Sequence, residues 1–357
     1  MKRTYKKIIY TSAIGCILFA GNAFGGNPQR TGQAGAQELL INPWARSSGW
    51  AGADIAGCRG LESMFLNVAG TAFTQKTELL FSHTSYLVGT DININSFGFS
   101  QRVGETGALS LGIMSMNFGN IPITTEALPD GGVGTYSPSF VNIGISYAKG
   151  FSENIFGGMT VRVVSENLPN LSAKGVALDA GIQYVTGKRD NIKFGISLKN
   201  VGPRMQFRGD GLSFVGTVPN TGTNLTVEQR SAEFEMPSLM NIGGRYDFIM
   251  LKDSSAKLNH RVSLAAAFVS NSFSKDQFLL GLEYSFRNYL MIRGGYAYEQ
   301  GIFNIDTRTT AFTGPTAGVS FEVPFGVGKK STFAIDYSYR ATNPFQGCHT
   351  IGARLNL

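Results

Sequence analysis

The side chains best suited to chemistry in this sequence are three histidines, which lie far apart at His83, His260 and His349. A metal site or a nucleophile–base pair that can be read from sequence needs closer spacing than this. A Ser-His-Asp site assembled from distant segments stays open, as in a membrane-embedded hydrolase. The run Gly131-Gly132-Val133-Gly134 has no helix pattern after it and indicates a loop rather than a phosphate cradle. We therefore expect a protein that is not an enzyme and needs no cofactor or metal.

Charged side chains form the second candidate set, and they alternate with apolar ones. Segment 278–301 reads FLLGLEYSFRNYLMIRGGYAYEQG, with apolar or aromatic residues at every second position and Glu283, Arg293 and Glu299 between them. Further residues of both signs occupy the same phase elsewhere, namely Arg162, Glu166, Asp179, Lys193, Arg245, Asp336 and Arg340. This alternation predicts strands with one apolar face and one charged face.

The first 25 residues, MKRTYKKIIYTSAIGCILFAGNAFG, predict a targeting segment. Four basic residues precede an apolar run that ends in small residues, which is typical of a secretory signal peptide over 1–25. Its removal takes away four positive charges and lowers the formal net charge from +7 to +3. Lysine and arginine are not clustered in the remaining chain, so a nucleic-acid partner is not expected.

Residues 26–76 lack alternation and are rich in glycine, alanine and serine. Both tryptophans of the chain, Trp44 and Trp50, lie here. We interpret this segment as a compact, partly helical plug or N-terminal cap. Cys58 and Cys348 are the only cysteines beyond the signal segment, and whether they form a disulfide stays open.

From residue 77 to 357 the pattern changes to alternating segments separated by turn signals, which indicates strands. We expect fourteen of them, over 77–88, 91–102, 107–118, 138–150, 154–167, 173–186, 190–201, 235–248, 258–270, 275–286, 288–300, 313–325, 330–341 and 346–357. An even number of antiparallel strands closes a barrel with both of its ends on one side.

The links between these segments predict where the barrel resides. The long links, 119–137, 202–234 and 301–312, all follow odd-numbered strands. Links after even-numbered strands are short, and the longest of them is 249–257. Outer-membrane barrels have short periplasmic turns and longer extracellular loops. The prediction is therefore all-β: a fourteen-stranded antiparallel transmembrane β-barrel with a small N-terminal plug, in the bacterial outer membrane. The alternative, a soluble β-sandwich, usually has strands of only about 5–6 residues.

In such a barrel the charged face points into the lumen, because a charge on the lipid face near mid-membrane costs about 2–4 kcal/mol. Two interpretations of these charges remain open. One is an internal network of paired charges that seats the plug. The other is a charged permeation path, although fourteen strands and a plug of about 50 residues argue against a wide pore.

Partner binding is expected on the extracellular loops, since a rigid wall presents them to solvent. The two loops richest in apolar residues are 202–234 and 301–312. Their candidate partner-binding residues are Met205, Phe207, Leu212, Phe214, Val215, Phe303 and Phe312. These side chains either form a protein-binding surface or pack over the mouth of the barrel.

Two motifs in the plug segment resemble a known family. The stretch LLINPWARSSGWAGADIA, 39–56, is similar to the opening of the PorV/PorQ family of Bacteroidetes outer-membrane proteins. The stretch LNVAGTAF, 66–73, resembles an Asn-Pro-Ala-Gly segment that those proteins share with the FadL fatty-acid transporters, with Val68 in place of the proline. The plug residues singled out in this way are Trp44, Arg46, Trp50 and Asn67.

The resemblance implies a FadL-like barrel and two alternative functions. PorV/PorQ-like proteins are non-enzymatic components of type IX protein secretion, with a translocon subunit, a cargo carrying a C-terminal signal domain or a surface-anchored protein as partner. FadL-like relatives carry hydrophobic small molecules through a lateral opening, which requires an apolar cavity and a break in the wall. A purely structural scaffold is a third possibility.

Overall fold

The structure is a computed structural model that describes residues 26–218, 221–251, 258–326 and 331–357. The expected signal peptide, 1–25, lies outside the described residues. Within the described ranges, no helix is both long and apolar enough to cross a membrane.

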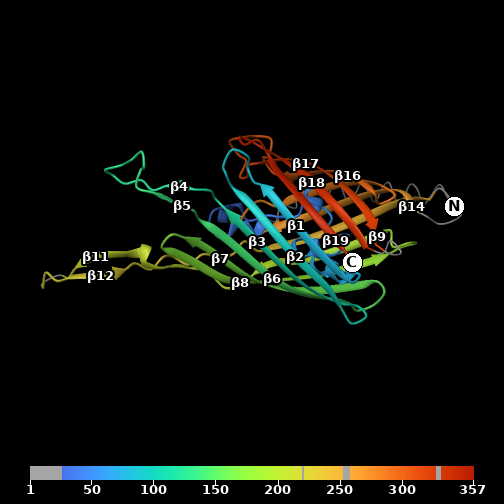
Figure 1. The fold of residues 1–357 in the computed structure, drawn as a ribbon, viewed down its shortest axis with the longest axis horizontal. Helices are drawn as coiled ribbons and strands as arrows, with labels where there is room; N and C mark the ends of the chain where they lie inside the picture. Colours follow the sequence, from blue (N-terminus) through green and yellow to red (C-terminus); the bar gives the residue numbers. More distant parts are fainter. Residues whose placement is uncertain (1–25, 219–220, 252–257, 327–330) are drawn as a thin grey trace.

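Fourteen long antiparallel strands form one closed sheet (Figure 1). They are β1 Thr77–Ser85, β2 Asn93–Val103, β3 Gly107–Asn117, β6 Ser139–Gly150, β7 Ile155–Leu168, β8 Leu171–Thr186, β9 Ile192–Val201, β13 Leu239–Leu251, β14 Leu258–Asn271, β15 Gln277–Phe286, β16 Leu290–Glu299, β17 Phe312–Phe325, β18 Ser331–Thr342 and β19 Cys348–Asn356. The first and last strands pair, and Leu357 N donates to Thr77 O at 2.9 Å. The predicted fourteen-stranded barrel is confirmed.

The two rims of the barrel differ. The rim that holds Thr77 and Leu357 also carries the short connection 287–289, where Arg287 and Asn288 both have a positive φ, and we call it the turn rim. The opposite rim, the loop rim, carries 118–138, 202–238 and 300–311. These loops contain short elements that alternation did not predict: β4 Ile121–Pro122, β5 Thr135–Tyr136, β10 Phe207–Arg208, η5 Asp210–Leu212, β11 Ser213–Thr217 and β12 Asn224–Glu228. Figure 1 shows β4–β5 and β11–β12 projecting from the loop rim.

The wall has an apolar outer face and a polar inner face. In β15, Leu280 and Leu282 are exposed on the outside, whereas Glu283 is fully buried on the inside. This arrangement follows from the strand period of two, which sends successive side chains to opposite faces.

Residues 37–76 fill the lumen with short helical turns: η2 Gln37–Leu40, α2 Ala45–Ser48, η3 Leu61–Phe65 and η4 Val68–Phe73. Trp44 packs with Leu61 against the wall residues Leu80 and Ile94, and Trp50 packs on the opposite side of the lumen, in a cluster with residues of β13, β14 and β15. The wall residue next to Trp50 has to be a glycine, because a Cβ built on Gly295 would lie 2.4 Å from the Trp50 carbonyl carbon.

Residues 26–36, which we call the N-terminal arm and which include η1 Pro28–Arg30, lie at the loop rim. Asn27 N donates to Ser274 O at 3.1 Å in the link between β14 and β15. Farther along the arm, Gly35 N donates to Glu235 O at 3.0 Å. Because β1 begins at the turn rim, the segment between the arm and β1 runs the height of the lumen.

Candidate functional site

The three histidines lie on the outer face of the wall, apart from one another. Their ring Nδ1 atoms hydrogen-bond to a neighbour on the adjacent strand: His83 to Asn95 at 2.8 Å, His260 to Tyr284 at 2.7 Å and His349 to Tyr337 at 2.8 Å. Amphipathic rings of this kind suit the girdles where a barrel meets the membrane surface. No group of three or more histidines, cysteines or acids in the described part of the chain is placed to hold a metal ion. Cys58 and Cys348 are buried free thiols.

Most of the predicted lumen charges form ion pairs. Arg245 donates to Asp54 of the plug at 2.7 Å and to Asp247 at 2.7 Å, and Lys193 contacts the other oxygen of Asp247. Arg162 donates to Asp179 at 2.8 Å and its guanidinium lies 4.5 Å from the centre of the Phe65 ring. Both groups therefore join the wall to the plug.

A third group lies between β14 and β19. Glu283 accepts from Arg293 at 2.6 Å and from Arg261 at 2.9 Å. Arg293 also donates to Ser320 at 2.6 Å, and Ser320 contacts Asp336. This geometry is that of internal ion pairs rather than of separated charges along an aqueous path.

Three of the predicted lumen charges have other surroundings, namely Glu299, Arg340 and Glu166. Glu299 accepts from the neutral side chain of Gln277 at 3.0 Å. The guanidinium of Arg340 lies 3.8 Å above the Phe312 ring. Glu166 lies beside a second carboxyl group, that of Glu38 in η2. Burial, and then the nearby Glu166 charge, raise the pKa of Glu38 above its ordinary value. Two adjacent carboxyl groups favour the binding of a proton, so this end of the lumen carries less negative charge than its sequence indicates.

The wall is interrupted between β8 and β9 near the loop rim. The ladder that joins these strands shifts register between Ala180 and Leu178, and Leu178–Val201 is its last pair. On this edge of β8, backbone pairing resumes only at Ala173, which lies opposite Phe207 of β10. β9 has 10 residues and β8 has 16, so β9 ends short of the loop rim, and the two-residue strand β10 pairs with β8 beyond the gap.

The interruption has a local cause at Asn200. This residue has a φ of 60°, and its backbone N–H donates to the Asp179 side chain at 2.7 Å instead of continuing the ladder. Its side-chain amide donates to Pro237 O at 3.0 Å. Asparagine tolerates the left-handed region better than most residues, which makes it suited to this break.

Apolar side chains line the inner side of the interruption. They form one buried cluster, the wall cluster: Ala36, Leu39, Val164, Ala173, Ala177, Met205 and Met236. Met205 and Met236 come from the two arms of loop 202–238, and Met205 and Phe234 exchange backbone hydrogen bonds at 2.8 and 2.9 Å. We call 202–207 together with 234–238 the flap. Methionine adapts to irregular spaces, so a flap anchored by methionines can repack.

A cavity of about 120 Å³ lies on the other side of η2. Leu39 of η2 belongs to the wall cluster, and its neighbour Leu40 lines the cavity. Most of the apolar lining comes from Ile55, Phe65, Leu66, Leu239, Val269 and Leu279. Polar side chains also line it, including Lys199, Arg340 and Asn241, so the cavity is of mixed polarity. Only one helical turn therefore separates this lumen cavity from an interruption of the wall.

The predicted loop residues divide into two groups. Phe214, Val215 and Phe303 are exposed, by 53%, 69% and 82% of their surfaces, and Leu212 is partly exposed. Met205 agrees with the second alternative, packing over the barrel mouth, because only 1% of it is accessible in the wall cluster. Phe207 packs against the same cluster, and Phe312 is covered by Arg340, so both belong to the barrel mouth.

The plug residues singled out in the sequence are all in the lumen. Trp44 and Trp50 are buried, and Arg46 pairs with Glu62 at 3.4 Å. Asn67 donates to Ile182 O at 3.0 Å and to Ile196 O at 3.3 Å, which joins the plug to β8 and β9. Sequence patterns gave no signal for Asn200 or Met236, whose roles depend on contacts with distant segments.

Comparisons with known proteins identify the fold. No protein-family model matches the sequence, and no curated protein is similar to it. Among solved structures, the CymD monoaromatic hydrocarbon channel has 14% identity and a TM-score of 0.50 over 88% of this chain and 97% of that one. The toluene transporter TbuX of Ralstonia pickettii has 15% identity and a TM-score of 0.50 over 88% and 97%. TodX, a toluene transporter of Pseudomonas putida, has 14% identity and a TM-score of 0.50 over 84% and 94%.

These similarities confirm the FadL-like barrel fold. The neighbours are channels and transporters rather than enzymes. At such low identity the likeness establishes the architecture alone, and nothing in these comparisons points specifically to PorV/PorQ proteins.

Proposed function

We propose that the protein spans the bacterial outer membrane and conducts small hydrophobic molecules between the lumen cavity and the membrane through the interruption between β8 and β9. The observation that carries this proposal is the position of the wall cluster, which lies directly behind the interruption. An apolar solute that crosses there meets Leu39 and Met236 rather than the charged pairs of the lumen. The transporters that share the fold are described as toluene and monoaromatic hydrocarbon channels, which supports the same class of solute.

The size of the cavity limits the solute. An apolar cavity of about 150 Å³ in another protein holds one benzene molecule. The cavity here, at about 120 Å³, therefore suits a solute of about one ring and is too small for a long acyl chain. Passage also requires the flap to move, because Met205 fills the space beside Gly175: a Cβ built on Gly175 would lie 2.6 Å from Met205 Cγ.

A reversible crosslink tests this proposal. The double variant Gly175→Cys, Met205→Cys places two thiols where the flap meets β8, because a Cβ at position 175 would lie 2.6 Å from the present Cγ of Met205. We expect oxidation to lower the uptake of radiolabelled toluene by roughly tenfold in cells that express the protein, because the flap can no longer move. A tenfold decrease corresponds to a rise of about 1.4 kcal/mol in the barrier to passage. Reduction should restore uptake.

Each single cysteine variant serves as the matched control and should transport equally under both conditions. Equal uptake by the oxidised and reduced double variant, with the crosslink verified by mass spectrometry, would exclude passage at the flap.

A second candidate function is protein docking at the hairpin β11–β12, as expected for a component of type IX secretion. Phe214 lies opposite Val227 and Gly216 opposite Leu225, so Phe214, Leu225 and Val227 share one face of the hairpin. All three are exposed. An isolated two-stranded hairpin is marginally stable in water, and a partner covering this face would stabilise it.

Replacing Phe214, Leu225 and Val227 with serine should abolish co-purification of a translocon or cargo protein from native membranes, while leaving the barrel assembled. The control, Thr217→Ser with Thr226→Ser, changes side chains of the same hairpin and removes only two methyl groups. If the triple variant retains its partners, this docking role is wrong.

A further inference from the structure

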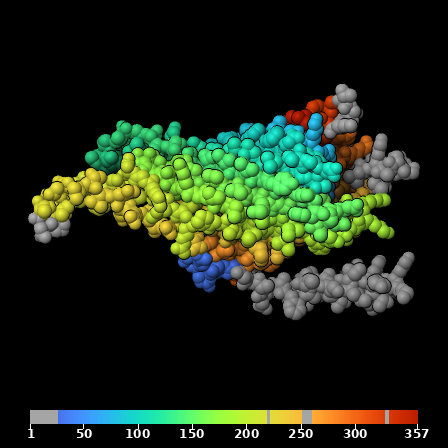
Figure 2. All heavy atoms as spheres, turned by 90° about the horizontal axis from the view of Figure 1, so that it is seen from below, coloured from blue at the N-terminus to red at the C-terminus, as the bar shows by residue number. Residues whose placement is uncertain are grey.

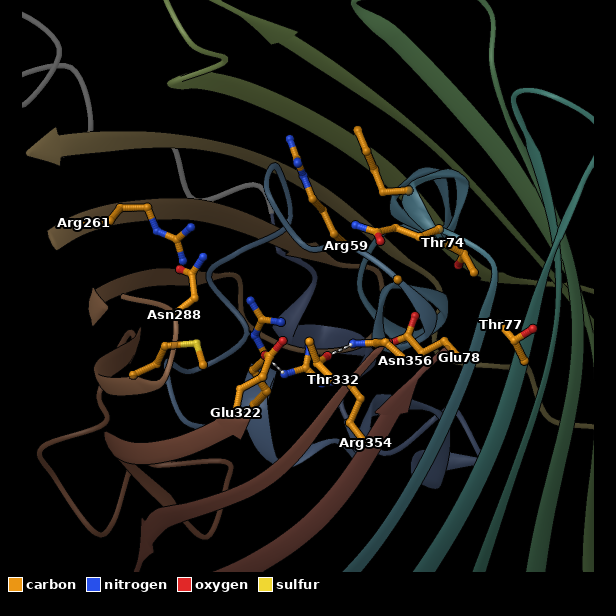
Figure 3. A pocket seen from close by; sticks show the side chains of 15 residues that line it. Arg59, Thr74, Thr77, Glu78, Arg261, Asn288, Glu322, Thr332, Arg354 and Asn356 are labelled. Atoms are coloured by element: carbon orange, nitrogen blue, oxygen red, sulfur yellow. Dashed lines mark hydrogen bonds and ion pairs between the residues drawn. The ribbon is translucent and has the colours of Figure 1, made fainter. Parts of the chain in front are cut away.

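A second and larger cavity, of about 420 Å³, lies at the turn rim (Figure 3). Its walls come from the plug, from β1, from β14, from the 287–289 turn and from β16 to β19. We call it the turn-rim pocket. Neither the wall cluster nor the flap contributes to it, so it is separate from the proposed path for hydrophobic molecules.

The charged lining of the turn-rim pocket is predominantly positive. It consists of Arg46, Arg59, Arg261, Arg354, Glu78 and Glu322. Figure 3 shows Arg59, Arg261 and Arg354 around the same space, each from a different element. Arginine is the side chain best matched to phosphate and carboxylate oxygens, because its donors are arranged as a planar fork.

Three of these arginines have carboxylate partners. Arg46 pairs with Glu62 at 3.4 Å, Arg261 with Glu283 at 2.9 Å and Arg354 with Glu322 at 3.0 Å. The Nε atoms of Arg261 and Arg354 are buried without a hydrogen-bond partner, and Arg354 Nε lies 4.0 Å from a carboxylate oxygen of Asp336. A buried donor without a hydrogen bond is unfavourable, so these guanidinium groups retain capacity for a further acceptor.

Arg59 differs from the other three. Its guanidinium lies 4.2 Å from the centre of the Phe73 ring, and within the described ranges it has no carboxylate partner. The aromatic contact holds the side chain in place while its donors remain available. Arg59 is thus a fixed cation that forms no ion pair with any described residue and lies at the edge of a polar pocket.

We propose that the turn-rim pocket binds a phosphate-bearing ligand, with Arg59 as its cation and with Arg261 and Arg354 lining the same space. The arginine fork matches phosphate oxygens, and a net positive lining favours a phosphate, which carries up to two negative charges, over a singly charged carboxylate. The volume of the pocket exceeds that of a phosphate ion and leaves room for a substituent. Free phosphate esters and phospholipid headgroups both carry this group, and on the predicted orientation the pocket faces the periplasm.

Ligand-induced stabilisation of the purified full chain tests the proposal. We expect inorganic phosphate at roughly 10 mM to raise the apparent melting temperature by about 2 °C over chloride at equal ionic strength. A short-chain phosphatidic acid, below its micellar concentration, forms the second arm. A larger shift with the lipid identifies a headgroup site, and a shift with inorganic phosphate alone identifies a soluble ligand.

Two variants with opposite expected effects test which side chains bind the phosphate. Arg59→Gln should weaken phosphate binding by at least roughly tenfold, the effect of losing one charge-assisted hydrogen bond. Glu322→Gln should strengthen binding, because it removes a negative charge from the lining and releases Arg354. Arg102→Gln, at the turn rim but outside the pocket, is the control and should bind like the unmodified protein.

The proposal is overturned if neither phosphate nor the lipid stabilises the protein beyond chloride. It is also overturned if Arg59→Gln and Arg102→Gln bind alike, since the effect would then be general screening of charge. Toluene uptake plays no part in these measurements, so their outcome is independent of the proposed transport function.

Discussion

Replacing Glu283 with leucine should lower the free energy of unfolding by about 3–5 kcal/mol, the cost of leaving a buried charge without its partner. Glu283 lies directly opposite Arg293 across the β15–β16 ladder, and neither side chain is accessible to solvent. Without the carboxylate, Arg293 retains only neutral hydrogen-bond partners. The loss is measurable as an earlier urea unfolding transition of the reconstituted barrel.

A compensating variant separates this charge effect from a packing effect. The double variant Glu283→Leu, Arg293→Met removes both charges and should recover most of the lost stability, because a buried pair is often replaceable by apolar residues at little cost. If the single variant unfolds like the unmodified barrel, or the double variant recovers nothing, the ion pair does not stabilise the wall as inferred here.

Replacing Gly181 with valine should release the plug from the wall. A Cβ at this position would lie 2.1 Å from Asn67 Oδ1. Asn67 would then lose its bonds to the carbonyls of β8 and β9, each worth about 1 kcal/mol, in addition to about 1–3 kcal/mol for overpacking. In planar lipid bilayers we expect the unmodified barrel to be closed to ions and the variant to conduct.

The matched control is Gly244→Val. Gly244 also lies in a wall strand, but its nearest neighbour to a built Cβ is 3.8 Å away, at Lys193 O. This variant should remain closed. Conductance equal in the two variants, or absent in both, would show that Asn67 does not anchor the plug.

Much of the wall was predictable because a strand repeats every two residues. Alternation around Glu283 and Arg293 identified both the strands and the face that points inward. Charged side chains are excluded from the lipid, so only one of the two faces of each strand can point outward. The predicted end of β9 at 201 agrees with the structure. Strand number followed from counting such segments.

The site was less predictable because it depends on contacts between distant segments. Asn200 reads as an ordinary strand residue, and its left-handed backbone is explained only by Asp179, which lies on a neighbouring strand. Met205 looks like an exposed loop residue because its burial depends on Gly175 and Met236. The turn-rim pocket is similarly hidden, since Arg59 and Arg354 are almost 300 positions apart, 354 − 59 = 295.

The course of the N-terminal arm constrains the order of assembly. The arm is fastened at the loop rim by Gly35 and by Arg30, which pairs with Glu235 at 3.1 Å, while β1 starts at the far rim (Figure 2 shows the first described residues in blue, protruding beside the wall). A closed barrel gives this segment no side entrance wide enough for Trp44 or Trp50. The plug is therefore enclosed either before the seam between β1 and β19 closes or by threading through one end of the barrel, and the second route has to carry both tryptophans through a lumen lined by ion pairs.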